Sequence, residues 1–181
     1  MLDPPRHDSW VFGYGSLIWN PDLPYLESRQ VRVKGWVRRF WQGSHDHRGT
    51  PEAPGRVVTL IAQPDAYCDG IAYRLEAAQV ARLFEGLDYR EKNGYERCTV
   101  TLEPHDGDAF EGVVYIATPE NEAFLGQAPS TDIAAHICRS EGPSGPNREY
   151  LLRLAAALRE LDVDDEHVFE LEHLVLGLTK R

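Results

Sequence analysis

The sequence has few of the features that mark secreted, metal-binding or membrane proteins. Its three cysteines, Cys68, Cys98 and Cys138, form no CxxC pair, which argues against a disulfide framework and a zinc knuckle. No apolar run approaches the roughly 20 residues that cross a bilayer. Residues 1–9, MLDPPRHDS, contain no apolar signal core. We therefore expect a cytoplasmic protein that spans no membrane and carries three reduced, buried thiols.

Positive charge is also scarce in this chain. Lysine and arginine number 19 against 29 aspartates and glutamates, for a formal net charge of −10. Nucleic-acid binding needs cations to neutralise phosphates, and docking on an anionic membrane needs a basic surface, so neither is expected. A hydrophobic fraction of 42% over 181 residues is typical of a globular chain. The length predicts a single domain over 10–181, and the polar residues 1–9 are expected to form a loose arm before it.

Hydrophobic patterning predicts strands in the first two thirds of the chain and helices in the last third. The expected strands are Trp10–Tyr14, Val31–Trp41 with a bulge at Gly35, Arg56–Ala62, Cys68–Leu75 after a Pro-Asp turn, Arg97–Glu103 and Phe110–Ala117. The expected helices cover 76–87 and three later segments capped by Ser130 or Thr131, by Asn147, and by Asp164 or Asp165. This order favours an α+β domain, and the strand count allows a small closed barrel.

A glycine-rich turn, GYGSL at 13–17, follows the first expected strand. Glycine lets a ligand approach the main chain closely, and successive amides in such a turn can converge on an anion. The turn lacks a dinucleotide fingerprint because position 18 is isoleucine, and it lacks a nucleophile elbow because Gly15 stands where serine is needed. An anion-binding turn and a plain tight turn both stay open on these grounds.

A charged stretch at 88–97 places carboxylates beside tyrosines between an expected helix and an expected strand. Aromatic neighbours can desolvate a carboxylate and raise its pKa toward that of a useful base. Composition alone does not choose among Asp88, Glu91 and Glu96. A solvated surface is the usual explanation for most of the charges in such a turn.

Two further polar loops contain residues that catalysis or metal binding could use. The first, at 38–49, contains His45, Asp46 and His47, but a metal site needs three or four ligands, so a surface loop is favoured. The second, at 142–150, contains Ser144, which misses the spacing of a nucleophilic serine because position 146 is proline. Ordinary loop chemistry is favoured over a lid or pocket edge for this segment.

Arginines in and near the first loop have two interpretations. Arg39, Arg48 and Arg56 can draw an anionic substrate toward this acidic protein, or they can serve structural ion pairs. The sequence does not decide between these roles.

Taken together, five stretches of the sequence resemble the ChaC family of γ-glutamylcyclotransferases. In order they are WVFGYGSLIW at 10–19, RRFWQGSHDHRGTP at 38–51, PGRVVTL at 54–60, YREKNGYER at 89–97 and EGPSGPNREYL at 141–151. The resemblance runs from about residue 10 to about residue 176. The first stretch alone would be weak, and the order of all five makes the resemblance specific.

The resemblance implies a γ-glutamyl cyclotransferase-like mixed β-barrel with flanking helices. It implies an enzyme that cleaves glutathione to 5-oxoproline and cysteinylglycine with no metal and no organic cofactor. It maps a catalytic glutamate onto Glu91 and a pocket residue onto Tyr150. The substrate-binding segment maps onto Val11, Phe12, Gly13, Tyr14, Gly15, Ser16 and Leu17.

Two alternatives and one property stay open at this point. The same chemistry could act on other γ-glutamyl amino acids or amines, and a comparison of substrates would separate these. A non-catalytic γ-glutamyl-binding protein is the second alternative, and the presence of Glu91 weighs against it. The oligomeric state is not predicted.

Overall fold

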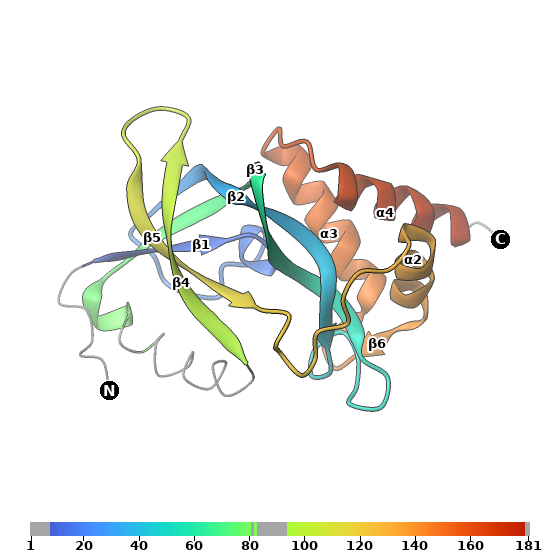
Figure 1. Ribbon diagram of the computed structural model, residues 1–181. Coiled ribbons are helices and arrows are strands. Elements are labelled where there is room, and N and C mark those ends of the chain that lie inside the picture. Colours follow the sequence, from blue (N-terminus) through green and yellow to red (C-terminus); the bar gives the residue numbers. More distant parts are fainter. Residues whose placement is uncertain (1–7, 81, 83–93, 180–181) are drawn as a thin grey trace. The chain divides into compact units, whose positions relative to one another are not determined.

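The computed structural model describes residues 8–80, 82 and 94–179, which belong to two compact units (Figure 1). Unit 1 is Met1–Val37 with Ala62–Asn121, and unit 2 is Arg38–Ile61 with Glu122–Arg181. The expectation of one domain over 10–181 stays a prediction. Two long strands contribute residues to both units.

A closed β-barrel with the strand order β1-β3-β2-β4-β5 organises unit 1. The strands are β1 (Ser9–Gly13), β2 (Glu27–Ser44), β3 (Gly55–Leu75), β4 (Tyr95–Pro104) and β5 (Phe110–Ala117). Strand β1 runs antiparallel to β3 and parallel to β5, which brings Val11 beside both Tyr73 and Val113. The predicted α+β class and closed barrel are therefore confirmed.

Inward-facing apolar residues build the core of the barrel. Val11, Tyr73, Leu75 and Val80 form a buried cluster, and Tyr73 and Leu75 alternate along β3 as a strand with one buried face requires. Val80 belongs to a helical stretch, since residues 77–80 and 82 are helical. The rest of the helix predicted at 76–87 lies outside the described residues, apart from Glu76, which is not helical.

Strand β3 corrects one sequence prediction. The two strands expected at 56–62 and 68–75 are one continuous strand, and no turn separates them. The intervening residues 62–67 are mostly exposed. Proline, which cannot donate to a strand ladder, is tolerated in such exposed or edge positions. Pro64 therefore lies within the strand instead of ending it.

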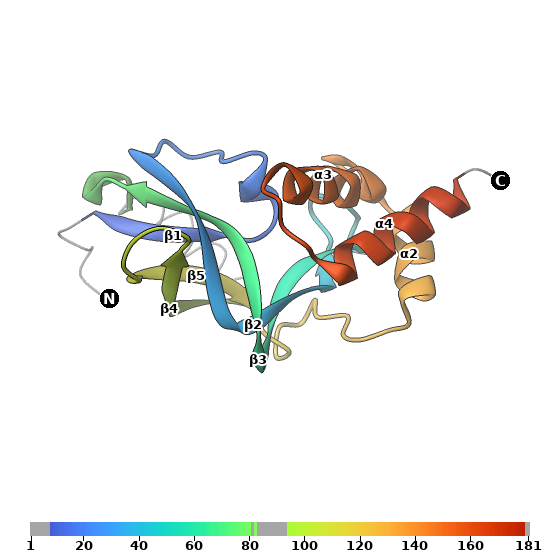
Figure 2. The ribbon, with the colours of Figure 1, turned by 90° about the horizontal axis from the view of Figure 1, so that it is seen from above.

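Three helices form the α-helical part of unit 2. They are α2 (Ser130–Arg139), α3 (Asn147–Glu160) and α4 (Glu166–Leu178), and all three pack on one another (Figure 2). Their buried apolar stripes follow the spacing of an amphipathic helix. The short strands β6 (Glu141–Gly142) and β7 (Gly145–Pro146) form a small hairpin between α2 and α3.

The predicted helix caps are correct for one helix of the three. Asp165 caps α4, accepting a hydrogen bond from the Val168 N–H at 3.1 Å. Prolines 129 and 146 precede α2 and α3 without a side-chain cap, because their fixed φ already suits the start of a helix. Ser130 instead donates to Glu170 at 2.8 Å. Asn147 binds the main chain of β3, so both predicted caps were wrong.

The three cysteines are free, but only Cys68 is buried. The expectation that all three are buried was therefore wrong for Cys98 and Cys138, which are partly exposed. Burial still raises the pKa of both thiols, which disfavours the reactive thiolate. Within the described ranges, no helix is long and apolar enough to cross a membrane.

Candidate active site

In unit 1, the chain turns sharply after β1, and the turn is possible because Gly13 has no side chain. The short 3-10 helix η1 (Ser16–Ile18) begins just after Gly15. The Ile18 N–H donates to the Gly15 carbonyl at 3.0 Å, which closes the turn. A Cβ atom on Gly13 would lie 2.7 Å from the Leu17 Cβ, closer than real Cβ atoms approach. Gly13 therefore lets Leu17 fold back over the end of β1.

The predicted substrate-binding segment has a buried half and an accessible half. Val11, Phe12 and Tyr14 are buried in the core of the barrel, and the Tyr14 hydroxyl donates to the Tyr115 carbonyl at 2.7 Å. Gly15 and Leu17 are partly exposed, and Ser16 is exposed. A ligand in solvent can reach this second half directly, whereas the buried residues support it from below.

The main-chain hydrogen bonds of the turn involve its carbonyl groups. The carbonyls of Gly15, Ser16 and Leu17 accept hydrogen bonds, the last from the Tyr73 hydroxyl at 2.6 Å. In the described part of the chain, the N–H groups of these three residues donate none of the hydrogen bonds observed. Unpaired consecutive N–H groups are suited to an anion. This pattern favours the anion-binding turn over a plain tight turn, and its role in binding substrate stays a prediction.

Tyr73 is a residue that the sequence analysis did not single out. Burial, with the nearby Tyr25 phenol, raises the pKa of Tyr73 to about 12. The hydroxyl therefore stays protonated and remains a donor to the Leu17 carbonyl. The signal that could have found it is the alternation along β3, because a tyrosine on an inward-facing position needs a hydrogen-bond partner.

In unit 2, Tyr150 lies on the first turn of α3 and is only 8% exposed. The Phe40 ring meets it edge-on at 5.9 Å, and the Arg48 guanidinium lies 5.9 Å from its centroid. Arg48 also donates to the Pro146 carbonyl at 3.1 Å and lies 3.7 Å from the Glu149 carboxylate. Arg48 thus contributes to the packing around Tyr150.

Arg56 is buried and bound to neutral groups. Its guanidinium donates to the carbonyls of Phe40 at 2.9 Å and Gly126 at 3.0 Å. Its Nε donates to Nδ1 of His136 at 3.4 Å, and Nε2 of that histidine pairs with the Pro54 carbonyl at 2.7 Å. Burial lowers the pKa of His136, so the ring is neutral and this pattern is consistent. Arg56 therefore has a structural role in unit 2, where its guanidinium binds main-chain carbonyls.

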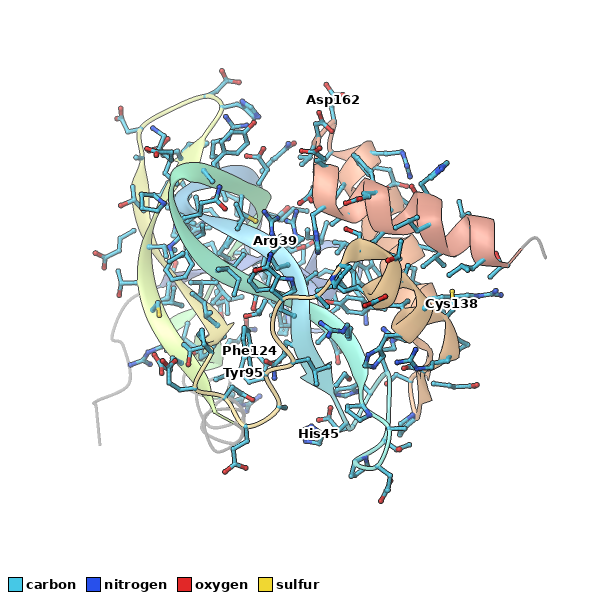
Figure 3. All side chains as sticks on the ribbon, turned by 45° about the vertical axis from the view of Figure 1, so that its right-hand side comes forward. Arg39, His45, Tyr95, Phe124, Cys138 and Asp162 are labelled. Atoms are coloured by element: carbon cyan, nitrogen blue, oxygen red, sulfur yellow. The ribbon has the colours of Figure 1, made fainter. Side chains whose placement is uncertain are left out.

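The remaining candidates are surface or loop residues. His45, Asp46 and His47 are exposed, and Figure 3 labels His45. No group of three histidine, cysteine or acidic side chains able to hold a metal occurs among the described residues. Nδ1 of His47 lies 3.1 Å from the Ser144 hydroxyl. Arg39 donates to the Arg38 carbonyl at 2.9 Å. The His47 contact joins its loop to the β6–β7 hairpin, whereas the Arg39 contact is local to β2.

The structure brings Val11–Leu17 together in unit 1 and places Tyr150 in unit 2. Glu91, predicted to be catalytic, lies outside the described residues, as does Asp88. Glu96, the third carboxylate of that stretch, lies on β4. The role of each predicted site residue therefore stays a prediction.

Comparison with known proteins covers nearly the whole chain. The family described as "ChaC-like protein" matches residues 9–178. Glutathione-specific gamma-glutamylcyclotransferase 1 of Danio rerio is 43% identical over 174 residues, which is 93% of this chain and 89% of that protein. Gamma-glutamylcyclotransferase 2-3 of Arabidopsis thaliana is 46% identical over 175 residues, with coverages of 92% and 87%.

A solved structure is similar over the same extent. A γ-glutamyl cyclotransferase from yeast, described as specific to glutathione, has a TM-score of 0.88 and 31% sequence identity to this chain. The match covers 95% of this chain and 97% of that one. Fold and sequence similarity thus extend over both units.

Proposed function

Because the chain belongs to the ChaC-like protein family, we propose that it is a glutathione-specific γ-glutamylcyclotransferase. The observation that carries this proposal is the 43% identity to a relative of that name over 93% of the chain. The turn at 15–17 supports it, because it offers main-chain donors to an anionic small molecule. We also propose a cytoplasmic location, since three free cysteines fit a reducing compartment.

The proposed reaction is an intramolecular acyl transfer. The α-amine of the γ-glutamyl unit attacks its own γ-carbonyl carbon and forms the C–N bond of 5-oxoproline. The bond to the cysteine nitrogen breaks, and that nitrogen leaves as the amine of cysteinylglycine. Because nucleophile and electrophile belong to one molecule, the protein mainly has to hold the substrate in a reactive pose.

Two proton transfers accompany the exchange of bonds, and we assign both to Glu91. The substrate amine has a reference pKa of about 8, so it is largely protonated at neutral pH and a base must remove a proton. The amine loses a second proton as it becomes the lactam N–H, and the departing nitrogen gains both protons as it leaves as the ammonium group of cysteinylglycine. One carboxyl group can accept and return each proton in turn. The position of Glu91 within the REKNGY stretch motivates the choice.

The turn after β1 is proposed to hold the negative charge of the substrate. The N–H groups of Gly15, Ser16 and Leu17 are candidates for binding either the α-carboxylate or the oxyanion that develops on the γ-carbonyl. Both assignments use the same donors. A β-branched residue in place of Gly15 would block the approach and weaken binding.

Gly13 offers a direct test of the turn. We expect Gly13→Ala to lower kcat/KM for glutathione by about tenfold or more, because the new Cβ displaces Leu17 and with it the donors. Steady-state kinetics measure the effect. The matched control is Gly177→Ala on α4, where a Cβ meets nothing within 4 Å. Equal kinetics for both variants would contradict a role for the turn.

The proposed function itself is tested with purified protein and reduced glutathione, in the presence of a chelator. We expect equimolar 5-oxoproline and cysteinylglycine, quantified by mass spectrometry. Activity on γ-glutamyl-alanine in place of glutathione would favour the broader substrate class. Glutathione binding without product would favour a non-catalytic role.

A further inference from the structure

The first turn of α3 is fixed by an asparagine that does not act as a cap. Asn147 is fully buried, at 0% exposure. Its Oδ1 accepts from the Arg56 N–H at 2.7 Å, and its Nδ2 donates to the Arg56 carbonyl at 2.8 Å. The side chain thus pairs with β3 through both main-chain groups of one residue, as a neighbouring strand would. This pairing needs one donor and one acceptor.

The surrounding backbone is shaped to admit this amide. A Cβ on Gly55 would lie 2.3 Å from the Arg48 carbonyl oxygen and 2.9 Å from the Asn147 Oδ1, so only glycine allows both groups to approach this closely. The Asn147 N–H also donates to the Ser140 carbonyl at 2.9 Å. One residue therefore joins the start of α3 to β3 and to the end of α2. Its orientation is determined by three hydrogen bonds.

Tyr150 follows three residues later on the same helix. Residues three apart lie on one face of a helix, so Tyr150 is carried on the side that Asn147 fixes. Its ring meets Phe40 edge-on and lies near the Arg48 guanidinium, both at 5.9 Å. Arg48 is itself held, because it donates to the Pro146 carbonyl and its N–H donates to the Ser44 hydroxyl at 2.9 Å.

We infer that Asn147 is a positioning residue that acts through Tyr150, with Arg48, whose guanidinium lies near the ring, as a second contributor. The inference rests on the proposed function and on the family resemblance, which maps a pocket residue onto Tyr150. Asn147 touches no substrate in this account. It sets where the first turn of α3, and therefore the tyrosine, lies against Phe40 and Arg48.

A double-mutant cycle tests whether Asn147 acts through Tyr150. We expect Asn147→Ser and Tyr150→Phe each to lower kcat/KM for glutathione by about tenfold to a hundredfold. Asn147→Ser in the Tyr150→Phe background should add less than about threefold, because residues that act as a unit are not additive. Fully multiplicative losses would overturn the inference.

Two further variants control for the effects of destabilisation or misfolding. Leu154→Ala, on the buried face of α3, destabilises the same helix without touching the asparagine, and its effect on kcat/KM should be equal in both backgrounds. Arg48→Met removes the guanidinium near the ring and leaves Asn147 in place. If Asn147→Ser does not fold, Arg48→Met replaces it in the double-mutant cycle. We then expect the same non-additivity with Tyr150→Phe. Additive losses for Arg48→Met would also count against the inference.

A second readout does not depend on activity. In protein labelled with 3-fluorotyrosine, the Tyr150 resonance is assigned by its loss in Tyr150→Phe. Asn147→Ser should shift it and leave that of Tyr115 in unit 1 unchanged. An unmoved Tyr150 resonance would overturn the inference. Absence of turnover by the wild type would instead refute the proposed function, and the resonance alone would then decide the positioning role.

Discussion

Glu91→Gln is expected to lower kcat for glutathione by about 10²–10⁴-fold, the contribution of a positioned general base, and to leave substrate affinity largely intact. Glutamine keeps the size and most of the polarity of glutamate but cannot accept and return a proton. The loss should therefore appear in kcat with little change in KM. Product formation under steady-state conditions, together with calorimetric binding of glutathione, measures both quantities.

Neighbouring carboxylates supply the controls for this variant. Asp88→Asn and Glu96→Gln remove the other two acidic side chains that composition left open. Glu96 lies exposed on β4, where the Thr118 hydroxyl approaches it at 3.4 Å. We expect both variants to keep most of the wild-type rate. A large loss in Glu96→Gln with a near-normal rate in Glu91→Gln would move the base to Glu96.

The barrel could be predicted from the sequence because its strands carry local signals. The alternation in 97–103 and the apolar run at 110–117 correspond to β4 and β5. Pro64 misled the prediction at β3, since proline marks turns in sequence but is tolerated in an exposed part of a strand. The caps failed for a related reason: serine and asparagine are good caps in general, and tertiary contacts of Ser130 and Asn147 took precedence.

Some residues of the candidate site could also be identified from the sequence, and others could not. The turn at 13–17 could be singled out from its glycines, and the structure explains Gly13 through its contact with Leu17. Glu91 followed from the family resemblance and not from composition. The hydrogen bond of Tyr73 to the turn spans a sequence separation of 56 positions, and that of Asn147 to β3 spans 91 positions. No local pattern encodes such pairings, so only the fold reveals them.

Unit 2 contains a histidine that should make the stability of the protein depend on pH. Nε2 of His167 on α4 accepts a hydrogen bond from the Phe40 N–H of β2 at 3.1 Å. Burial, and then the charge of Arg39, lower the pKa of His167 from 6.5 to about 4, against the opposing effect of Asp165. A proton on Nε2 would also remove the acceptor that the Phe40 N–H needs.

The direction of the pH effect follows from the lowered pKa. As pH falls below about 6.5, an unfolded chain binds a proton at this histidine while the folded protein does not, so acid favours unfolding. The contribution is fully present above about pH 6.5 and is lost as pH falls through about 4. Its total is about 3 kcal/mol in the free energy of unfolding.

His167→Gln isolates this contribution, because glutamine can accept from the Phe40 N–H and does not titrate. Urea unfolding at pH 7.5, 6.0 and 4.5 is followed by circular dichroism, which reports the helices of unit 2. Between the highest and lowest pH, the wild type should lose about 2–3 kcal/mol more than His167→Gln. His173→Gln, at an exposed position of α4, should behave as the wild type. Equal losses in all three proteins would mean that His167 binds its proton in the folded state as readily as in the unfolded chain.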